Sequence, residues 1–253
     1  MSAGGAVWSA AGASHVGAVR RVNEDAWIAR PELALFVVAD GLGGHARGDL
    51  ASRTVVEELA ALAPAADLGR LEAAVRGALE RAHERIRDVA EREGTSIGTT
   101  VALLLARDGA AAVLWAGDSR IYRLRDGGMT PSTRDHSQVQ EMVDRGLLRA
   151  EEARRHPWRN RITRALGTAS TLELERRSVE LQAGDVFLLC SDGLTSVLEE
   201  GVIEALLARY RCEAVRHLIA AALARGAPDN VTVVIAEYGE DPDRTLPGGF
   251  GRP

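Results

Sequence analysis

Four aspartates at the ends of apolar runs are the residues in this 253-residue chain most able to do chemistry. Asp40, Asp118 and Asp192 each follow such a run, and Asp229 precedes another at 231–236. A short, unbroken apolar run predicts a strand that is buried on both faces. If these strands lie side by side, four carboxylates gather at one end of the core. Grouped carboxylates must take up protons, repel one another or bind cations, and a hard divalent cation is their common partner.

Asp-Gly pairs also form ordinary hairpin turns, so the aspartates need a control within the same chain. Two further Asp-Gly pairs provide it: 108–109 lies between two strand-like runs, and 126–127 follows a third. The pairs at 40–41 and 192–193 are followed instead by helical patterns. We therefore predict hairpin turns at 108–109 and 126–127, and functional carboxylates at Asp40 and Asp192.

The composition excludes several classes of protein. Hydrophobic residues make up 46% of the chain, as in globular proteins, and no stretch approaches the roughly 18 apolar residues that span a bilayer. The formal net charge is -5, so the chain lacks the overall positive charge that is typical of proteins that bind nucleic acid. The amino terminus does not resemble a secretory signal, and two cysteines exclude a disulfide framework. We expect a cytoplasmic protein that binds neither nucleic acid nor membranes.

The residue types exclude several catalytic sites. The chain contains no lysine, since all 31 of its Lys and Arg residues are arginine, and this excludes P-loop and Schiff-base chemistry. A cysteine phosphatase would need arginine at the sixth position after its nucleophile, but Ser196 follows Cys190 there and Leu218 follows Cys212. An aspartyl-phosphate phosphatase would need Asp-x-Asp, whereas Asp40 leads into Gly-Leu-Gly.

The order of elements favours a layered α+β fold. Apolar alternation and short apolar runs predict strands at 13–29, 33–39, 99–106, 110–116, 121–124, 172–181, 186–190 and 231–238. Helical spacing predicts helices at 47–62, 68–92, 137–146, 199–209 and 212–225. The longer helices come in pairs between groups of strands, unlike alternating βαβ units. We expect one domain over residues 1–240 and a disordered tail at 241–253.

Five short motifs, in this order, resemble the protein phosphatase 2C (PP2C or PPM) family of metal-dependent Ser/Thr phosphatases. They are Gly-x-x-Arg-x-x-Asn-Glu-Asp at 17–25, Asp-Gly-x-Gly-Gly at 40–44, Gly-Asp-Ser-Arg at 117–120, Ser-Asp-Gly-Leu at 191–194 and Asp-Asn-Val-Thr at 229–232. Segment 135–167 resembles the bacterial branch of the family. The resemblance implies two antiparallel sheets packed face to face with pairs of helices outside, a four-layer αββα sandwich.

The resemblance also implies a role for each matching residue. Asp40 would bridge two Mn²⁺ or Mg²⁺ ions, with Asp192 and Asp229 completing the first ion's ligands. The other implied metal-site residues are Gly41, through its carbonyl oxygen, Glu24 and Asp25, through metal-bound waters, and Asp118, which with Asp192 would bind a third, weaker ion. Arg20 would grip the phosphoryl group. The expected catalytic residues are therefore Arg20, Asp40 and Asp192.

Elementary chemistry explains these residue types. A phosphomonoester is an anion, so two cations that share a carboxylate would screen its oxygens and lower the pKa of a bound water. Oxygen ligands without a His or Cys cluster select Mg²⁺ or Mn²⁺ rather than zinc. The arginine guanidinium group can donate hydrogen bonds to two phosphate oxygens at once. The expected reaction is direct in-line attack by metal-bound hydroxide on phosphoserine or phosphothreonine.

Two questions stay open from the sequence. Leu42 stands where eukaryotic relatives have a histidine proposed as general acid, and His45 is either its substitute or an ordinary loop residue. The polar segment 131–168 corresponds to the flap beside the family's active site. Its arginines, Arg159 and Arg161 among them, either bind and steer phosphorylated peptides or form a solvated face that pairs with Glu151 and Glu152.

The expected partners are phosphorylated proteins, the targets of a bacterial Ser/Thr kinase, and the chain is expected to act as a monomer. Two alternatives are a catalytically silent PP2C-like binding module and a phosphatase for small phosphorylated metabolites. A silent module should lose metal ligands, yet Asp40, Asp118, Asp192 and Asp229 are all present.

Overall fold

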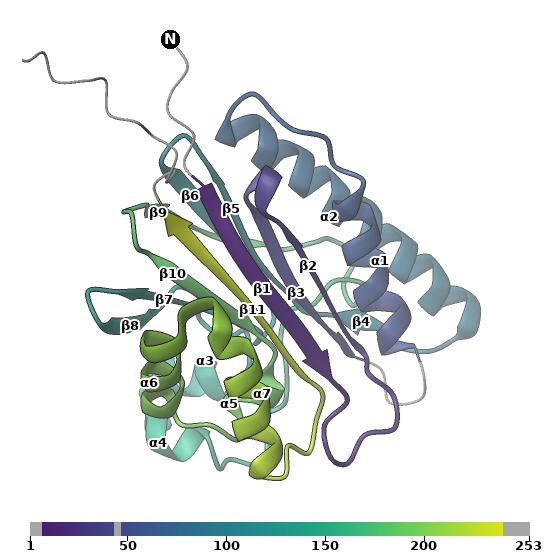
Figure 1. Cartoon of the computed structure of the whole chain (residues 1–253). Coiled ribbons are helices and arrows are strands. Elements are labelled where there is room, and N and C mark those ends of the chain that lie inside the picture. Colours follow the sequence, from purple (N-terminus) through teal and green to yellow (C-terminus); the bar gives the residue numbers. More distant parts are fainter. Residues whose placement is uncertain (1–6, 43–46, 240–253) are drawn as a thin grey trace, which may run out of the picture.

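Two antiparallel β-sheets packed face to face form the centre of the molecule (Figure 1). The computed structural model describes residues 7–42 and 47–239. The predicted tail at 241–253 and His45 lie outside the described residues. None of the helices in the described part of the chain is long and apolar enough to cross a membrane.

Each sheet joins strands that are far apart in the chain. The first sheet contains, in spatial order, β1 (Val7–His15), β11 (Val231–Gly239), β10 (Val186–Cys190), β7 (Arg120–Arg125) and β8 (Gly128–Pro131). The second contains β2 (Asp25–Arg30), β3 (Leu35–Leu42), β5 (Val101–Arg107), β6 (Ala110–Ala116) and β9 (Glu175–Glu180), with β4 (Gly98–Thr99) paired to β3.

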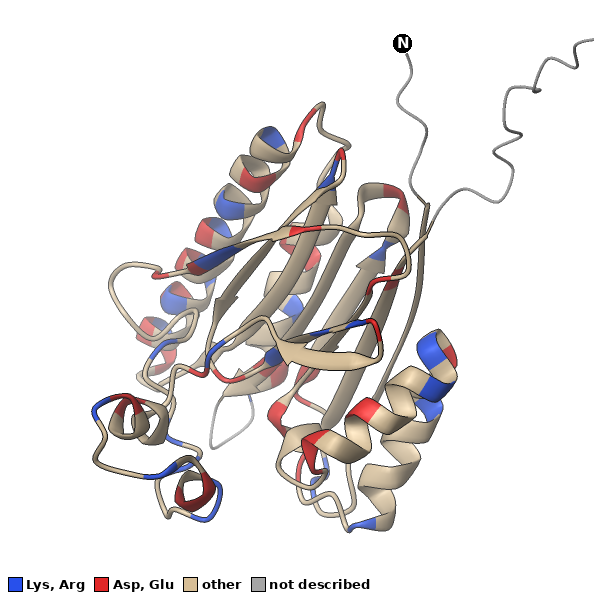
Figure 2. Cartoon of the chain, turned by 90° about the vertical axis from the view of Figure 1, so that its left-hand side faces the viewer, with Lys and Arg blue, Asp and Glu red and all other residues tan. Residues whose placement is uncertain are grey.

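Helix pairs cover the outer face of each sheet, as Figure 1 shows. The pair on the second sheet is α1 (Gly48–Ala60) and α2 (Leu68–Glu93), and the pair on the first is α6 (Glu200–Tyr210) and α7 (Ala214–Ala224). Basic and acidic residues alternate along α2 (Figure 2). The predicted four-layer αββα sandwich is therefore confirmed.

Strand β3 shows why an unbroken apolar run is needed in such a sandwich. Leu35 and Val37 pack toward α1 and α2, whereas Phe36 and Val38 face the layer between the two sheets. Successive side chains of a strand point to opposite faces, so a strand buried on both faces must be apolar at every position. The apolar run therefore places Asp40 at the end of a buried strand.

Both predicted hairpin turns are confirmed. Asp108 and Gly109 have φ of 54° and 79°, and Asp126 and Gly127 have φ of 51° and 81°, as two-residue hairpins require. The other two pairs do not form hairpin turns: residues 40–41 lie inside β3, and Asp192 begins the short helix α5 (Asp192–Thr195).

Two strand predictions need correction. The expected strand at 13–29 is wrong, since β1 ends at His15 and β2 begins at Asp25. The loop between them turns at Gly17, whose φ is 82°, and its Val16 and Val22 carbonyl oxygens accept hydrogen bonds from the Asn230 side chain. The strand predicted at 172–181 is shorter, Glu175–Glu180.

The flap contains two short helices, α3 (Gln138–Asp144) and α4 (Ala150–Ala153). Ser137 caps α3, since its hydroxyl accepts a hydrogen bond from the Gln140 amide. The helix predicted at 137–146 is confirmed over its centre. Both short helices lie beyond the ends of the sheets (Figure 2).

Candidate metal centre and active site

The fold brings the predicted aspartates to one end of the sandwich. Asp25 at the start of β2 lies opposite Asp40 near the end of β3 in the antiparallel register. Asp118 follows β6, and Asp192 follows β10. Asp229 precedes β11, which pairs with β10.

These carboxyl groups are close enough to perturb one another. Burial, and then the charges of Asp25 and Asp192, raise the pKa of Asp40 well above its usual range. Burial and the charge of Asp192 do the same to the pKa of Asp118. The pKa of Asp192 rises to about 6 through burial and the charge of Asp229. The cluster therefore carries unfavourable negative charge in a buried place.

Asp25 is held by two hydroxyl groups through one oxygen only. Ser191 Oγ donates to its Oδ2 over 2.8 Å, and Thr232 Oγ1 donates to the same oxygen over 2.5 Å. Burial raises the pKa of Asp25 to about 7. Its Oδ1 is buried and has no hydrogen-bond partner among the described residues, and the same is true of Asp118 Oδ1. An unpartnered buried oxygen is rare in proteins and needs an explanation.

Glu24 and Gly41 lie against the start of α1. Glu24 Oε1 accepts a hydrogen bond of 3.1 Å from the Gly48 amide, and its backbone oxygen accepts one from Ser52. A Cβ atom at Gly41 would lie 2.2 Å from the Gly48 carbonyl oxygen and 2.6 Å from that of Glu24. Only glycine fits there, because three backbone segments meet beside the aspartates.

A divalent cation fits this set of donors. Within residues 7–42 and 47–239, no group of three or more His, Cys, Asp or Glu side chains is placed so that it could hold a metal ion as it stands. The available donors are nevertheless all oxygens, two of them buried and unpartnered, and their charges repel one another. Mg²⁺ or Mn²⁺ prefers oxygen ligands, would give the two unpartnered oxygens a partner and would reduce the repulsion between the carboxylates. The individual ligand roles stay predictions.

Arg20 lies beside the cluster on the loop between β1 and β2. Its Nη2 donates a hydrogen bond of 2.8 Å to Asp229 Oδ2, and its side chain is half-exposed. The guanidinium group has five N–H donors, so further donors stay available for an anion. The structure thus brings the predicted phosphoryl-binding arginine next to a predicted metal ligand.

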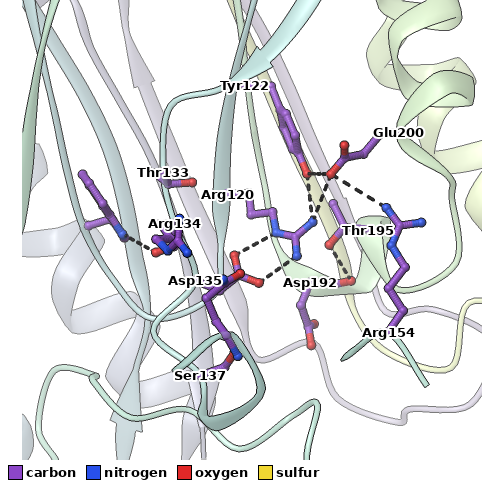
Figure 3. A network of polar contacts seen from close by, with 12 residues as sticks. Arg120, Tyr122, Thr133, Arg134, Asp135, Ser137, Arg154, Asp192, Thr195 and Glu200 are labelled. Atoms are coloured by element: carbon purple, nitrogen blue, oxygen red, sulfur yellow. Dashed lines mark hydrogen bonds and ion pairs between the residues drawn. The ribbon is translucent and has the colours of Figure 1, made fainter. Parts of the chain in front are cut away.

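A partly buried ion pair next to Asp192 was not predicted from the sequence. Arg120 donates to both carboxylate oxygens of Asp135, over 2.8 and 2.7 Å, and to the Tyr122 hydroxyl over 3.0 Å (Figure 3). Tyr122 in turn donates to Glu200. Arg120 lies in the Gly-Asp-Ser-Arg motif, and this motif was the available signal. The Asp135 carboxylate raises the pKa of Asp192, and the Arg120 cation lowers it to a smaller extent.

Four of the flap arginines fall into two groups. Arg154 pairs with Glu199 and Glu200 at the start of α6, and Arg164 pairs with Glu173 and Glu175. These two arginines therefore attach the flap to the rest of the domain.

The second group contains the predicted substrate-binding residues. Arg159 and Arg161 have no acidic partner among the described residues, and Arg161 lies over the exposed Trp158 ring at 4.9 Å. Glu152 pairs with Arg149, and neither Glu151 nor Glu152 pairs with Arg159 or Arg161 among the described residues, so the choice between substrate steering and a solvated face stays a prediction. Arg159 and Arg161 are thus free to meet an anionic partner.

Comparisons with known proteins agree with this geometry. The family model described as protein phosphatase 2C matches residues 11–226. The Serine/threonine protein phosphatase PstP of Mycobacterium tuberculosis is 42% identical over 226 residues, which cover 87% of this chain and 43% of that protein. This chain therefore spans less than half the length of that relative.

Solved structures share the whole fold. PppA, described as a key regulatory component of T6SS in Pseudomonas aeruginosa, matches with a TM-score of 0.86 and 42% identity over 92% of this chain and 100% of that one. The catalytic domain of PstP in complex with two manganese ions matches with a TM-score of 0.82 and 38% identity over 93% of this chain and 100% of that one. The chain belongs to the protein phosphatase 2C family.

Proposed function

We propose that this protein is a Mn²⁺- or Mg²⁺-dependent phosphatase that hydrolyses phosphoserine and phosphothreonine in proteins. The observation that carries the proposal is the meeting of Asp40, Asp118, Asp192 and Asp229 at one end of the sandwich, beside the half-exposed Arg20. Relatives named Ser/Thr protein phosphatases, and a related structure with two manganese ions, support the same activity.

Each residue has a defined task in this reaction. Bound cations would supply Lewis acidity and a solvent nucleophile of lowered pKa. Asp40 would be shared between two cations, and Asp192 and Asp229 would complete the ligands of one of them. The Gly41 carbonyl oxygen, Glu24 and Asp25, which would act through water, and Asp118, at a third and weaker site, are the further proposed metal-site residues. Arg20 would hold the phosphoryl oxygens in position for in-line attack.

The flap would provide part of the substrate surface. Arg159 and Arg161 carry positive charge that no described acid neutralises. We propose that they attract the phosphorylated segment of a protein substrate, which a Ser/Thr kinase would have produced. The chain would do this as a monomer.

Hydrolysis of a phosphopeptide and of p-nitrophenyl phosphate tests the activity. We expect turnover with Mn²⁺, loss of turnover with EDTA, and loss of at least about a hundredfold in kcat for Asp192→Asn. Asp108→Asn is the matched control, since Asp108 also precedes a glycine but lies in a hairpin turn. No turnover at all would favour the silent module, and turnover that EDTA does not affect would contradict the metal dependence. A preference for sugar phosphates over phosphopeptides would favour the metabolite phosphatase.

A further inference from the structure

The loop at 16–24, which carries Arg20, is held by one buried side chain from a distant part of the sequence. Asn230 Nδ2 donates hydrogen bonds to the Val16 and Val22 carbonyl oxygens, over 2.9 and 3.0 Å. Its Oδ1 accepts one of 2.8 Å from the Glu24 amide. Asn230 is 5% exposed, so water does not compete for these bonds. Both amide hydrogens and the amide oxygen are therefore used on this loop.

The chain around Asn230 also contacts the loop directly. The Ala18 amide donates to the Ala227 carbonyl oxygen over 2.9 Å. A Cβ atom at Gly17 would lie 2.1 Å from the Asp229 carbonyl oxygen, and Gly17 has φ of 82°. Arg20 then bonds to Asp229 itself. The loop and segment 227–230 thus form one packed unit.

Other residue types would not make these contacts. Aspartate has the same shape as asparagine but no amide hydrogens, so it would turn a carboxylate oxygen toward the Val16 and Val22 carbonyls. Serine is too short to reach three backbone groups on a loop. A single amide side chain thus satisfies backbone groups that no neighbouring strand serves.

We propose that Asn230 is a positioning residue for phosphoryl binding. Its amide holds loop 16–24 in one conformation, so that Arg20 stays beside Asp229 and within reach of the substrate's phosphoryl group. Because Asn230 directly follows Asp229 in the chain, a shift of loop 16–24 would also shift Asp229, the proposed metal ligand. The inference rests on the proposed function, since it takes Arg20 as the residue that binds the phosphoryl group.

Steady-state kinetics of Asn230 variants test the inference. We expect Asn230→Asp and Asn230→Ser to raise KM for p-nitrophenyl phosphate about tenfold, with a smaller change in kcat. In an Arg20→Gln background the same substitutions should change KM by less than about twofold, because Arg20, through which they act, is already replaced. The serine variant separates lost hydrogen bonds from the added charge of the aspartate variant. Leu218→Ala, which removes a core side chain of α7, is the control for general loss of stability.

Hydrogen exchange gives a readout independent of activity. In metal-free protein, Asn230→Ser should speed exchange of backbone amides in segment 16–24 while α7 stays protected. Unchanged exchange in the loop, or KM effects that multiply with those of Arg20→Gln, would overturn the inference. A wild-type protein without Mn²⁺-dependent turnover would instead overturn the proposed function, and the exchange result would still show whether Asn230 holds the loop.

Discussion

The Arg20 guanidinium group donates a hydrogen bond to Asp229 across 2.8 Å, although 209 residues separate the two in the chain. The arginine side chain is 52% exposed and the aspartate side chain 30%. A cation suited to phosphate therefore lies at the solvent side of a buried acidic cluster. This arrangement would bring a phosphoryl group to the cluster without burying the arginine.

Arg20→Gln tests the role of this pair. Charge-assisted hydrogen bonds contribute roughly 1.5–3 kcal/mol, so KM should rise about tenfold to a hundredfold. The matched control is Arg21→Gln, which changes the neighbouring exposed arginine and should leave KM near the wild-type value. Similar KM values for both variants in steady-state assays would contradict the role given to Arg20.

The acidic cluster predicts an unusual pH dependence of stability. The folded pKa values of Asp25, about 7, and Asp192, about 6, lie above the values expected in the unfolded chain. The folded state therefore binds more protons, and its stability falls as pH rises through these values. In EDTA, the melting temperature should be higher at about pH 6 than at about pH 8.

Divalent cations should cancel that loss of stability. Mn²⁺ at a hundredfold excess over its Kd would stabilise the folded state by about 2.7 kcal/mol. At about pH 8 the melting temperature should therefore rise on adding Mn²⁺, and Asp40→Asn should reduce the rise. A melting temperature that changes with neither Mn²⁺ nor pH would show that the carboxylates do not act as a cluster.

Gly193 should not tolerate a side chain. A Cβ atom there would lie 1.9 Å from the Asn230 carbonyl oxygen, so Gly193→Ala must push Asp192 away from segment 229–230. We expect a lower melting temperature together with lower kcat. Gly201→Ala is the matched control, since a Cβ atom at that position in α6 meets open space and alanine favours a helix by up to about 1 kcal/mol. Equal melting temperatures for the two variants would contradict this packing.

The flap arginines should affect large substrates only. Replacing Arg159 and Arg161 together by glutamine should lower kcat/KM for an acidic phosphopeptide about tenfold and leave p-nitrophenyl phosphate hydrolysis unchanged. Equal loss on both substrates, or no loss on either, would contradict steering by these residues. Arg154→Gln is a useful comparison, because it breaks the attachment to Glu199 and Glu200 instead.

Local patterns predicted those parts of the fold that depend on local physics. Unbroken apolar runs identified the buried strands, because a strand between two layers must be apolar on both faces. The two hairpin turns followed from residue type, because Asp-Gly tolerates positive φ. Apolar runs that end in aspartate therefore indicate the acidic cluster from the sequence.

The sequence alone thus predicted most of the buried strands, both hairpin turns and the candidate carboxylates at the strand ends, but not the loop at 16–24. Only the tertiary structure decided which side chains meet: Asn230 with loop 16–24, Arg120 with Asp135, and Arg154 with α6. Such pairings depend on how layers pack and on which buried polar groups still need a partner. The spacing of residues along the chain indicates neither how the layers pack nor which buried polar groups need a partner. The partners come from segments that only folding brings together.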